Sequence, residues 1–437
     1  MINELKIVAV IPAKGSSERV QNKNLRLVDG EPLVLRAVRK CVQSKFFDEV
    51  WIDTESQEII DLCEDYNCKV MKRHTKFASN KVDGNKLLLN EINHIDSDIY
   101  CQILCTSPFL EINSIIEGIN KLIDPSNTFD SVIAGTFEKL YTWGKNKSSY
   151  SLQDIPNSID LDNTFIESMG LYIIDKLTAK RLKRRIGDNP FKLEINKIEA
   201  VDVNYEKDLF LANLISSGLR EQENSKLRIL SKILSSGLIS DVLDELGFKD
   251  NFINHKLHHN IPNKKLFGRA KTLSLRNINP NEDVDKIYES HNIYENIKLN
   301  DLLIVDNKTD YSFFGEINSS FAIRSGASGA IIFGPTRDIN ATKALDFPVY
   351  YKTLCSKDIR GRGSLKSFNK SIIIDNVKIE PNQLVFIDHE GLAVIPFHIE
   401  DEVIKRSTNK ISSENLIISG ITEGLNNSKL MSKFGYF

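Results

Sequence analysis

The chain has 437 residues, 41% of them hydrophobic, with 57 basic and 59 acidic residues and a net charge of −2. This length exceeds what one hydrophobic core organises, so we expect two domains of roughly 200 residues each. The balanced charge argues against nucleic acid binding, and apolar runs such as 302–305 are far below the roughly 20 residues of a membrane span. We therefore expect a cytoplasmic protein that contacts neither nucleic acid nor membrane.

Strands and helices alternate through the first part of the chain. Short apolar runs typical of buried strands are followed by segments with helical periodicity. This alternation predicts βαβ units, and hence a parallel sheet with helices on both faces. The predicted elements are strand 6–12, helix 32–46, strand 49–53, helix 56–66, strand 69–73, helix 85–94, strand 99–104, helix 112–123, strand 131–135 and helix 206–217.

A polar segment without apolar periodicity, residues 218–227, separates this part from a second pattern of strands and helices. We expect one domain over residues 1–220, a second over 228–412 and a C-terminal tail over 413–437. The tail is rich in Ser and Asn, so we expect it to pack loosely or to contact a neighbouring subunit.

The cysteines indicate neither a disulfide framework nor a zinc site. They are scattered, form no CxxC pair and have no nearby His ligands. We expect reduced, mostly buried thiols that pack as small apolar groups. The six positions are Cys41, Cys63, Cys68, Cys101, Cys105 and Cys355.

The loop 11–24, IPAKGSSERVQNKN, directly follows the first predicted strand. In open α/β sheets, ligands bind at the carboxyl ends of strands. Small residues let backbone N–H groups approach phosphate oxygens, and basic residues supply the countercharge. The loop fits neither a Walker A nor a GxGxxG pattern, and it predicts a triphosphate site. The residues suited to this role are Gly15, Ser16, Ser17, Lys14, Arg19 and Lys23.

Three segments occur in a recognisable order: AKGSSERVQNKN at 13–24, CQILCTSPFL at 101–110 and VDVNYEKDL at 201–209. They resemble the A-R-G-G-S-x-R-x-x-x-K-N, LQPTSPLR and IDIDTELDL segments of the acylneuraminate and 3-deoxy-octulosonate cytidylyltransferases, the CMP-sugar synthetases. The resemblance implies a Rossmann-like nucleotidyltransferase domain, similar to the GT-A fold and dimeric. It also implies transfer of CMP from CTP to a 2-keto-3-deoxy sugar acid, with release of pyrophosphate.

The resemblance assigns roles residue by residue. The residues matched to the CTP phosphates and nucleotide are Lys14, Gly15, Ser16, Ser17, Lys23 and Asn24, with Arg73 near the cytosine. Those matched to the sugar side are Gln102, Thr106 and Ser107. Those matched to the Mg²⁺ site are Asp202 and Asn204. Catalysis would consist of positioning and charge neutralisation by Lys14, Lys23, Gln102 and Mg²⁺ while the anomeric hydroxyl attacks the α-phosphate in line.

Three departures from the family pattern bear on substrate and metal. Lys14 replaces an arginine, which keeps the charge and loses the bidentate fork. Asn204 replaces the second metal aspartate, although Mg²⁺ often relies on one or two carboxylates plus phosphate oxygens and water. Phe109 stands near the position of the arginine that follows TSP, so the acceptor sugar stays open.

The second half contains one informative run, residues 313–339. We expect Glu316 to begin an amphipathic helix whose free N–H groups form an anion site. The predicted strand 330–333 then leads to Arg337 and Asp338, which can divide the binding of a carboxylate and a divalent cation. The predicted apolar positions of the helix are Ile317, Phe321 and Ile323.

Four segments over residues 228–400 resemble the family of the regulator of ribonuclease activity A and the class II 4-hydroxy-4-methyl-2-oxoglutarate aldolases. They are ISDVLDELG at 239–247, GEI at 315–317, the G-x-x-G-x-V-x-x-G-x-x-R-D-like run 326–338 and the run 381–396 with Asp388 and Gly391. The resemblance implies a swivelling ββα-type domain that forms trimers or hexamers. In an aldolase, Arg337 would bind the carboxylate of pyruvate, Asp338 a second Mg²⁺ or Mn²⁺, and Glu316 the metal-bound water.

Several alternatives stay open at the level of sequence. The nucleotide could be UTP or GTP, since the preference for cytidine rests on resemblance. The second domain could perform aldol chemistry, or form or proofread the acceptor sugar of the first. Alternatively, the protein could be regulatory or structural: the second domain would bind a partner or only assemble the homo-oligomer, and one or both catalytic sites would be inactive. Phe333 stands where many aldolase-like members have aspartate, which weakens the catalytic alternative.

Overall fold

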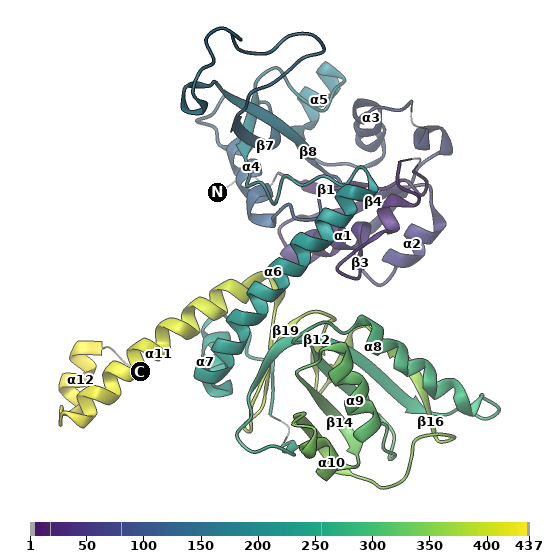
Figure 1. The fold of residues 1–437 in the computed structure, drawn as a ribbon, viewed down its shortest axis with the longest axis vertical. Coiled ribbons are helices and arrows are strands. Elements are labelled where there is room, and N and C mark those ends of the chain that lie inside the picture. Colours follow the sequence, from purple (N-terminus) through teal and green to yellow (C-terminus); the bar gives the residue numbers. More distant parts are fainter. Residues whose placement is uncertain (1–4, 18, 80, 255, 435–437) are drawn as a thin grey trace. The chain divides into compact units, whose positions relative to one another are not determined.

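The computed structural model describes residues 5–17, 19–79, 81–254 and 256–434. These residues belong to two compact units that divide after Gly218 (Figure 1). The elements of unit 1 are β1 (Ile7–Pro12), β2 (Leu27–Val28), β3 (Glu31–Pro32), α1 (Leu33–Ser44), β4 (Glu49–Thr54), α2 (Gln57–Cys63), β5 (Lys69–Lys72), α3 (Gly84–His94), β6 (Ile99–Ile103), α4 (Ile112–Ile123), β7 (Ser131–Lys139), β8 (Asn163–Asp175), α5 (Lys176–Leu182), β9 (Pro190–Glu194) and the first part of α6 (Glu206–Ile233).

The main sheet of unit 1 has the strand order β5-β4-β1-β6-β8-β7-β9. Side chains of β1 alternate between two cores because successive strand residues face opposite sides of a sheet. Ala9 and Ile11 pack with α1, α2 and α4 on one face, and Val8 and Val10 pack with α3 and α5 on the other. The sheet is therefore covered by helices on both faces, as predicted from the alternation of elements.

One strand departs from the predicted parallel sheet. β8 runs antiparallel to both β6 and β7, whereas β5, β4, β1 and β6 run parallel to one another. The reason is the connection, because β7 leads into β8 as a hairpin in which Lys139 lies opposite Asn163, and hairpin strands are antiparallel.

Helix α6 continues through residues 218–227, where the sequence predicted a break between domains. The segment GLREQENSKL contains no proline, and Leu, Arg, Glu, Gln and Lys are good helix formers. Its last turns bury Leu227 and Leu230 in the core of unit 2. The helix thus begins in unit 1 and ends in unit 2.

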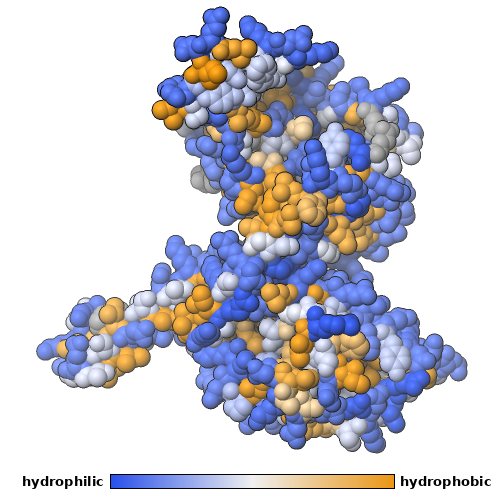
Figure 2. Space-filling model, viewed as in Figure 1, coloured by the Kyte–Doolittle hydropathy of each residue, from blue (hydrophilic) through white to orange (hydrophobic). Residues whose placement is uncertain are grey.

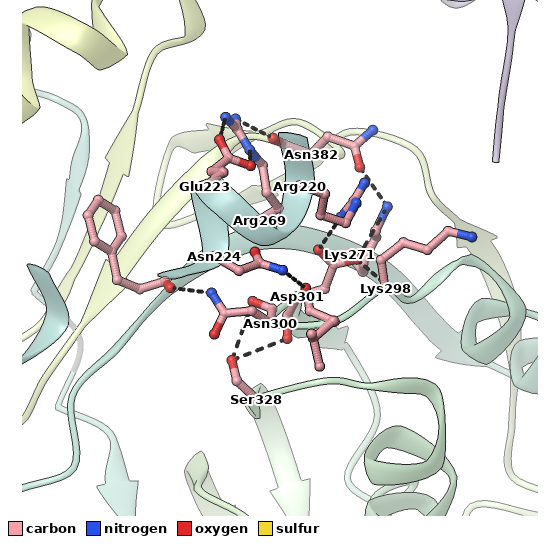
Figure 3. A network of polar contacts seen from close by, with 12 residues as sticks. Arg220, Glu223, Asn224, Arg269, Lys271, Lys298, Asn300, Asp301, Ser328 and Asn382 are labelled. Carbon is pink, nitrogen blue, oxygen red and sulfur yellow. Dashed lines mark hydrogen bonds and ion pairs between the residues drawn. The ribbon is translucent and has the colours of Figure 1, made fainter. Parts of the chain in front are cut away.

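A polar network ties the second part of α6 into unit 2 (Figure 3). Arg269 is ion-paired to Glu223 of α6 and, at 2.7 Å, to Glu400. Arg220 pairs with the buried Asp301 at 3.3 Å, and the side-chain amide of Asn224 donates to a backbone carbonyl at 2.9 Å. Separating this part of α6 from unit 2 would leave the buried charges of unit 2 without their partners, which is costly. This part of α6 therefore belongs structurally to unit 2.

Unit 2 contains a mixed sheet with the path β10-β20-β19-β12-β13-β14-β15-β11, and β16 pairs with β12. Strands β12 to β15 are parallel to one another, and the flanking strands are antiparallel. Its elements are α7 (Ser236–Glu245), β10 (Phe252–Ile253), β11 (His258–His259), β12 (Leu266–Asn277), α8 (Ile293–Asn296), β13 (Leu302–Asn307), α9 (Glu316–Ser325), β14 (Gly329–Thr336), α10 (Ile339–Ala344), β15 (Val349–Leu354), β16 (Gly363–Phe368), β17 (Ile372–Ile374), β18 (Val377–Ile379), β19 (Leu384–Ile387), β20 (Leu392–Ile395), α11 (Glu400–Thr422) and α12 (Asn427–Phe434).

Helix α9 begins at Glu316 as predicted, but its buried face differs from the predicted one. Ile317 is 70% exposed and Ile323 is 41% exposed, whereas Ser319 and Ala322 are buried against the sheet. Small residues let the helix approach the strands closely, so Ile317 and Ile323 point away from the core, whereas Phe321 packs against it as predicted.

The predicted C-terminal tail is helical rather than irregular, because it forms the end of α11 and all of α12. Figure 2 shows apolar surface interspersed along these two helices. The exposed apolar side chains there are Leu416, Ile418, Ile421 and Met431. In the described part of the chain, no helix is both long and apolar enough to cross a membrane, and the six cysteines are free thiols.

Candidate functional site

The three segments that carry the first resemblance come together at the carboxyl ends of the parallel strands of unit 1. Lys23 Nζ donates to Asn204 Oδ1 at 3.3 Å, which joins the loop after β1 to the segment 201–209. The backbone N–H of Val203 donates to the carbonyl of Thr106 at 2.8 Å. Residues separated by about 180 positions thus meet where ligands of α/β sheets bind.

The loop after β1 is held by its own side chains and by an acidic neighbour. The buried Asn24 donates its side-chain amide to the Lys14 carbonyl at 2.9 Å. The N–H of Gly15 donates to Glu55 Oε1 at 2.7 Å, so in this conformation it is not free for a phosphate. Ser16 is exposed and Ser17 half-buried.

The predicted metal residues form a compact acidic corner. Asn204 donates its side-chain amide to Asp202 Oδ2, while Asp202 Oδ1 is buried and has no hydrogen-bond partner among the described residues. Asp208 Oδ2 already accepts hydrogen bonds from the backbone N–H groups of Asn204 and Tyr205, at 3.0 and 2.8 Å. One carboxylate oxygen is therefore available to a cation, which suits Mg²⁺ bound mainly by phosphate oxygens.

Lys23 faces this acidic corner from a half-buried position. Burial lowers its pKa, and the nearby charge of Asp202 acts in the opposite direction. A lysine held between a carboxylate and other basic groups can neutralise developing negative charge without moving.

A fully buried polar network lies behind the site and contains two of the predicted residues. Arg73, 5% exposed, is ion-paired to the buried Asp53 at 2.9 Å. Gln102, 1% exposed, donates to Glu91 Oε2 at 2.6 Å. The charge of Asp53 acts on the nearby Glu91, so the two pairs interact electrostatically. Arg73 and Gln102 are thus placed together, but as interior groups.

The two acids of this network differ in ionisation. Burial raises the pKa of Glu91 well above its ordinary range, and the charge of Asp53 raises it further. Burial also raises the pKa of Asp53, although the charge of Arg73 opposes this shift. Of the two acids, Glu91 is thus the one whose neutral form burial favours more strongly.

The turn after β6 presents the sugar-side residues. Thr106 and Ser107 are buried, and the hydroxyl oxygen of Ser107 has no hydrogen-bond partner among the described residues. Gly170 of β8 lies directly against Ser107, and a methyl group there would overlap the serine side chain. Only a glycine at this place lets β8 pass so close to the turn.

The second predicted site, in unit 2, lies between the end of β14 and the start of α9. Arg337 pairs with Asp358 at 2.8 Å and approaches Asp338 at 3.5 Å. Asp338 Oδ2 also accepts the backbone N–H of Glu316 at 3.4 Å, at the first residue of α9. The structure thus brings Arg337, Asp338 and Glu316 together as predicted. In the described residues, no group of three or more His, Cys, Asp or Glu side chains is arranged to hold a metal.

Comparisons with known proteins follow this division. Residues 8–180 match the protein-family model described as cytidylyltransferase, and residues 237–394 match the RraA-like model, described as Aldolase/RraA. The 3-deoxy-manno-octulosonate cytidylyltransferase of Francisella tularensis subsp. novicida is 30% identical over 196 residues, which cover 43% of this chain and 75% of that protein. The chain belongs to the cytidylyltransferase family.

Two further relatives show the range of the similarity. The N-acylneuraminate cytidylyltransferase of Escherichia coli O18:K1:H7 is 23% identical over 305 residues, covering 65% of this chain and 69% of that protein. The solved structure of RraAS2 from Streptomyces coelicolor has 20% sequence identity and a TM-score of 0.38, covering 44% of this chain and 93% of that one. By the two family models, the cytidylyltransferase unit is followed by an RraA-like unit.

Sequence reasoning missed two acids that contact predicted site residues, Glu55 beside Gly15 and Glu91 beside Gln102. Sequence reasoning did not find Glu91 because a polar residue in a predicted amphipathic helix is normally solvent-exposed. In the structure, the side chain of Glu91 lies on the buried face of α3. The roles predicted for the site residues stay predictions, since the structure gives their positions and not their reactions.

Proposed function

We propose that this cytidylyltransferase transfers CMP from CTP to a 2-keto-3-deoxy sugar acid and releases pyrophosphate. The observation that carries the proposal is the junction of Lys23 with Asp202 and Asn204, three residues from two motifs that resemble those of CMP-sugar synthetases. The named activities of the relatives from Francisella and E. coli support this reaction class.

The chain's own residues would act mainly by positioning and charge neutralisation. Lys14 and Lys23 would bind the phosphates of CTP, so that the anomeric hydroxyl of the acceptor attacks the α-phosphorus in line. The bond to the bridging oxygen of pyrophosphate breaks and the hydroxyl proton is released. Asp202 Oδ1 would bind Mg²⁺ that arrives with the triphosphate, and that ion supplies charge neutralisation at the phosphates.

The proposal is tested by pyrophosphate release from CTP and Mg²⁺ with sialic, legionaminic and deoxyoctulosonic acids as acceptors. We expect release with one of them, and loss of about 100- to 1,000-fold in kcat/KM for Lys23→Ala, the typical effect of removing one group that stabilises transition-state charge. UTP and GTP in place of CTP test the base preference. Absence of release with every acceptor and nucleotide would contradict the proposal.

For the RraA-like unit, the cluster of Arg337, Asp338 and Glu316 favours a second function. A guanidinium beside a carboxylate at a helix N-terminus suits a 2-oxo acid such as pyruvate together with Mg²⁺ or Mn²⁺. This unit would then form or cleave a carbon–carbon bond to pyruvate, the chemistry that makes 2-keto-3-deoxy acids.

A coupled assay of pyruvate formation from 4-hydroxy-2-oxo acids tests this second function, with Arg337→Ala as the control variant. Pyruvate release that requires Arg337 supports a bifunctional enzyme. If wild-type protein and variant release none, an assembly or partner-binding role accounts better for the RraA-like unit.

A further inference from the structure

Arg185 is a cationic side chain that packs against neighbouring residues and, among the described residues, has no anionic partner. It lies between α5 and β9, and its guanidinium carbon is 3.5 Å from the centre of the Tyr172 ring. Among the described residues its guanidinium makes no ion pair or hydrogen bond, whereas the preceding Arg184 is ion-paired to Asp188. A stacked guanidinium keeps its N–H edge open, and that edge fits a carboxylate.

Three contacts with two elements, α3 and β8, fix the position of Arg185. Its backbone N–H donates to Asn85 Oδ1 of α3 at 2.9 Å. Gly84, the first residue of α3, lies so close that a methyl group there would overlap the guanidinium. The third support is Tyr172 of β8, which is 1% exposed and therefore rigid. The side chain is thus preorganised, so little conformational entropy is lost when it binds an anion.

The register of the sheet places this arginine on the acceptor side of the site. Tyr172 lies directly opposite Gln102 of β6. Gly170 precedes Tyr172 by two residues, so it lies on the same face of β8, and it contacts Ser107 of the sugar-side turn. Arg185 therefore covers the face of the sheet on which the sugar-side residues lie.

The phosphates of CTP are a less suitable partner for Arg185. The predicted phosphate loop follows β1, and the strand order places β6 between β1 and β8. Tyr172, on which Arg185 stacks, therefore lies two strand spacings, about 10 Å, from the strand that this loop follows. The remaining anion of the proposed reaction is the carboxylate of the sugar acid.

Two acids near the arginine are hydrogen-bonded to groups other than its guanidinium. Glu167 of β8 is exposed, and its Oε1 accepts a hydrogen bond from the hydroxyl group of Tyr172. Asp83, next to Gly84, accepts the backbone N–H of Lys86 at 2.9 Å and approaches its ammonium group at 3.7 Å. Both carboxylates have partners of their own.

We propose that Arg185, stacked on Tyr172 and bordered by Gly84, binds the carboxylate of the acceptor sugar acid. The inference rests on the proposed cytidylyl transfer and deepens it, because it names the group by which this chain selects an acid over a neutral sugar.

Steady-state kinetics of Arg185→Gln, with Arg184→Gln as the matched control, test the inference. We expect the KM for the sugar acid to rise about 10- to 100-fold, the loss typical of a charged hydrogen bond, while the KM for CTP stays within about twofold of wild type. Arg185→Lys should recover part of the loss, since it keeps the charge without the fork. Arg184→Gln should behave as wild type.

The methyl ester of the acceptor provides a second readout. Esterification should weaken binding to wild type strongly and to Arg185→Gln hardly at all, because the same interaction is already lost. Equal penalties in both proteins would overturn the inference, as would a rise in the KM for CTP instead of the acceptor. If wild-type protein converts no sugar acid, the proposed function fails, and the carboxylate role of Arg185 fails with it.

Discussion

The two candidate sites of this protein differ in how completely their polar groups are paired. In the cytidylyltransferase unit, Asp202 Oδ1 and the hydroxyl of Ser107 are buried and have no hydrogen-bond partner within the described residues, and the half-buried Arg185 is stacked on Tyr172. In the RraA-like unit, Arg337 is ion-paired to Asp358 at 2.8 Å and lies beside Asp338.

This difference has an energetic meaning. Buried groups without partners cost stability, and a protein keeps them where a ligand supplies the missing interactions. The cytidylyltransferase unit therefore keeps two buried polar atoms open to a ligand, although the Gly15 N–H is bonded to Glu55, whereas a ligand of Arg337 would have to displace an existing ion pair. The following predictions test this contrast.

The largest effect is expected for Asp202→Asn. The substitution removes the free carboxylate charge and keeps the shape, so we expect kcat/KM to fall by about 100-fold, because charge neutralisation by a metal contributes several kcal/mol to such reactions. A Mg²⁺ titration of pyrophosphate release measures it, and the Mg²⁺ concentration at half-maximal rate should rise. An unchanged Mg²⁺ dependence would place the cation elsewhere.

An intermediate effect is expected for Asp358→Asn in the RraA-like unit. The amide keeps the acceptor for the Arg360 N–H, which now lies 2.7 Å from Asp358 Oδ1, and it releases Arg337 from its charged partner. We expect pyruvate to bind about two- to fivefold more tightly, since an exposed ion pair contributes about 0.2–1 kcal/mol. Calorimetric titration checks this, with Arg337→Ala as the negative control. Equal affinity in wild type and Asp358→Asn would mean that Arg337 does not bind the ligand.

The smallest effect is expected for Glu91→Gln, measured as the free energy of unfolding. At pH 5 it should lie within about 1 kcal/mol of wild type, because an amide keeps a donor and an acceptor. The pKa of Glu91 is raised in the folded protein. As the pH rises above the pKa that Glu91 has in the unfolded chain, the unfolded chain releases a proton that the folded chain retains. The free energy of unfolding of the wild type therefore falls.

Glutamine does not titrate, so the stability of Glu91→Gln relative to wild type should increase between pH 5 and pH 8. Denaturant unfolding at several pH values measures this difference. A constant difference would show that Glu91 ionises at the same pH in the folded and unfolded chains.

The sequence alone predicted much of the local structure. The alternation of apolar runs and helical segments gave strands β1, β4 and β6 and helices α1, α3 and α4 nearly residue by residue. These elements follow from local periodicity, which the chain carries regardless of its neighbours. The same holds for the basic loop after β1, since a short loop between a strand and a helix has to lie at the carboxyl edge of the sheet.

Only the tertiary structure decided which polar groups meet. Glu91 lies in a helix, Asp53 at the end of a strand and Arg185 in a loop, so no sequence spacing relates them; the packing of α3 and α5 on one sheet face brings them to the site. The exposed Ile317 of α9 and the uninterrupted α6 have the same cause. Burial depends on the elements packed against a residue, and these come from distant parts of the chain.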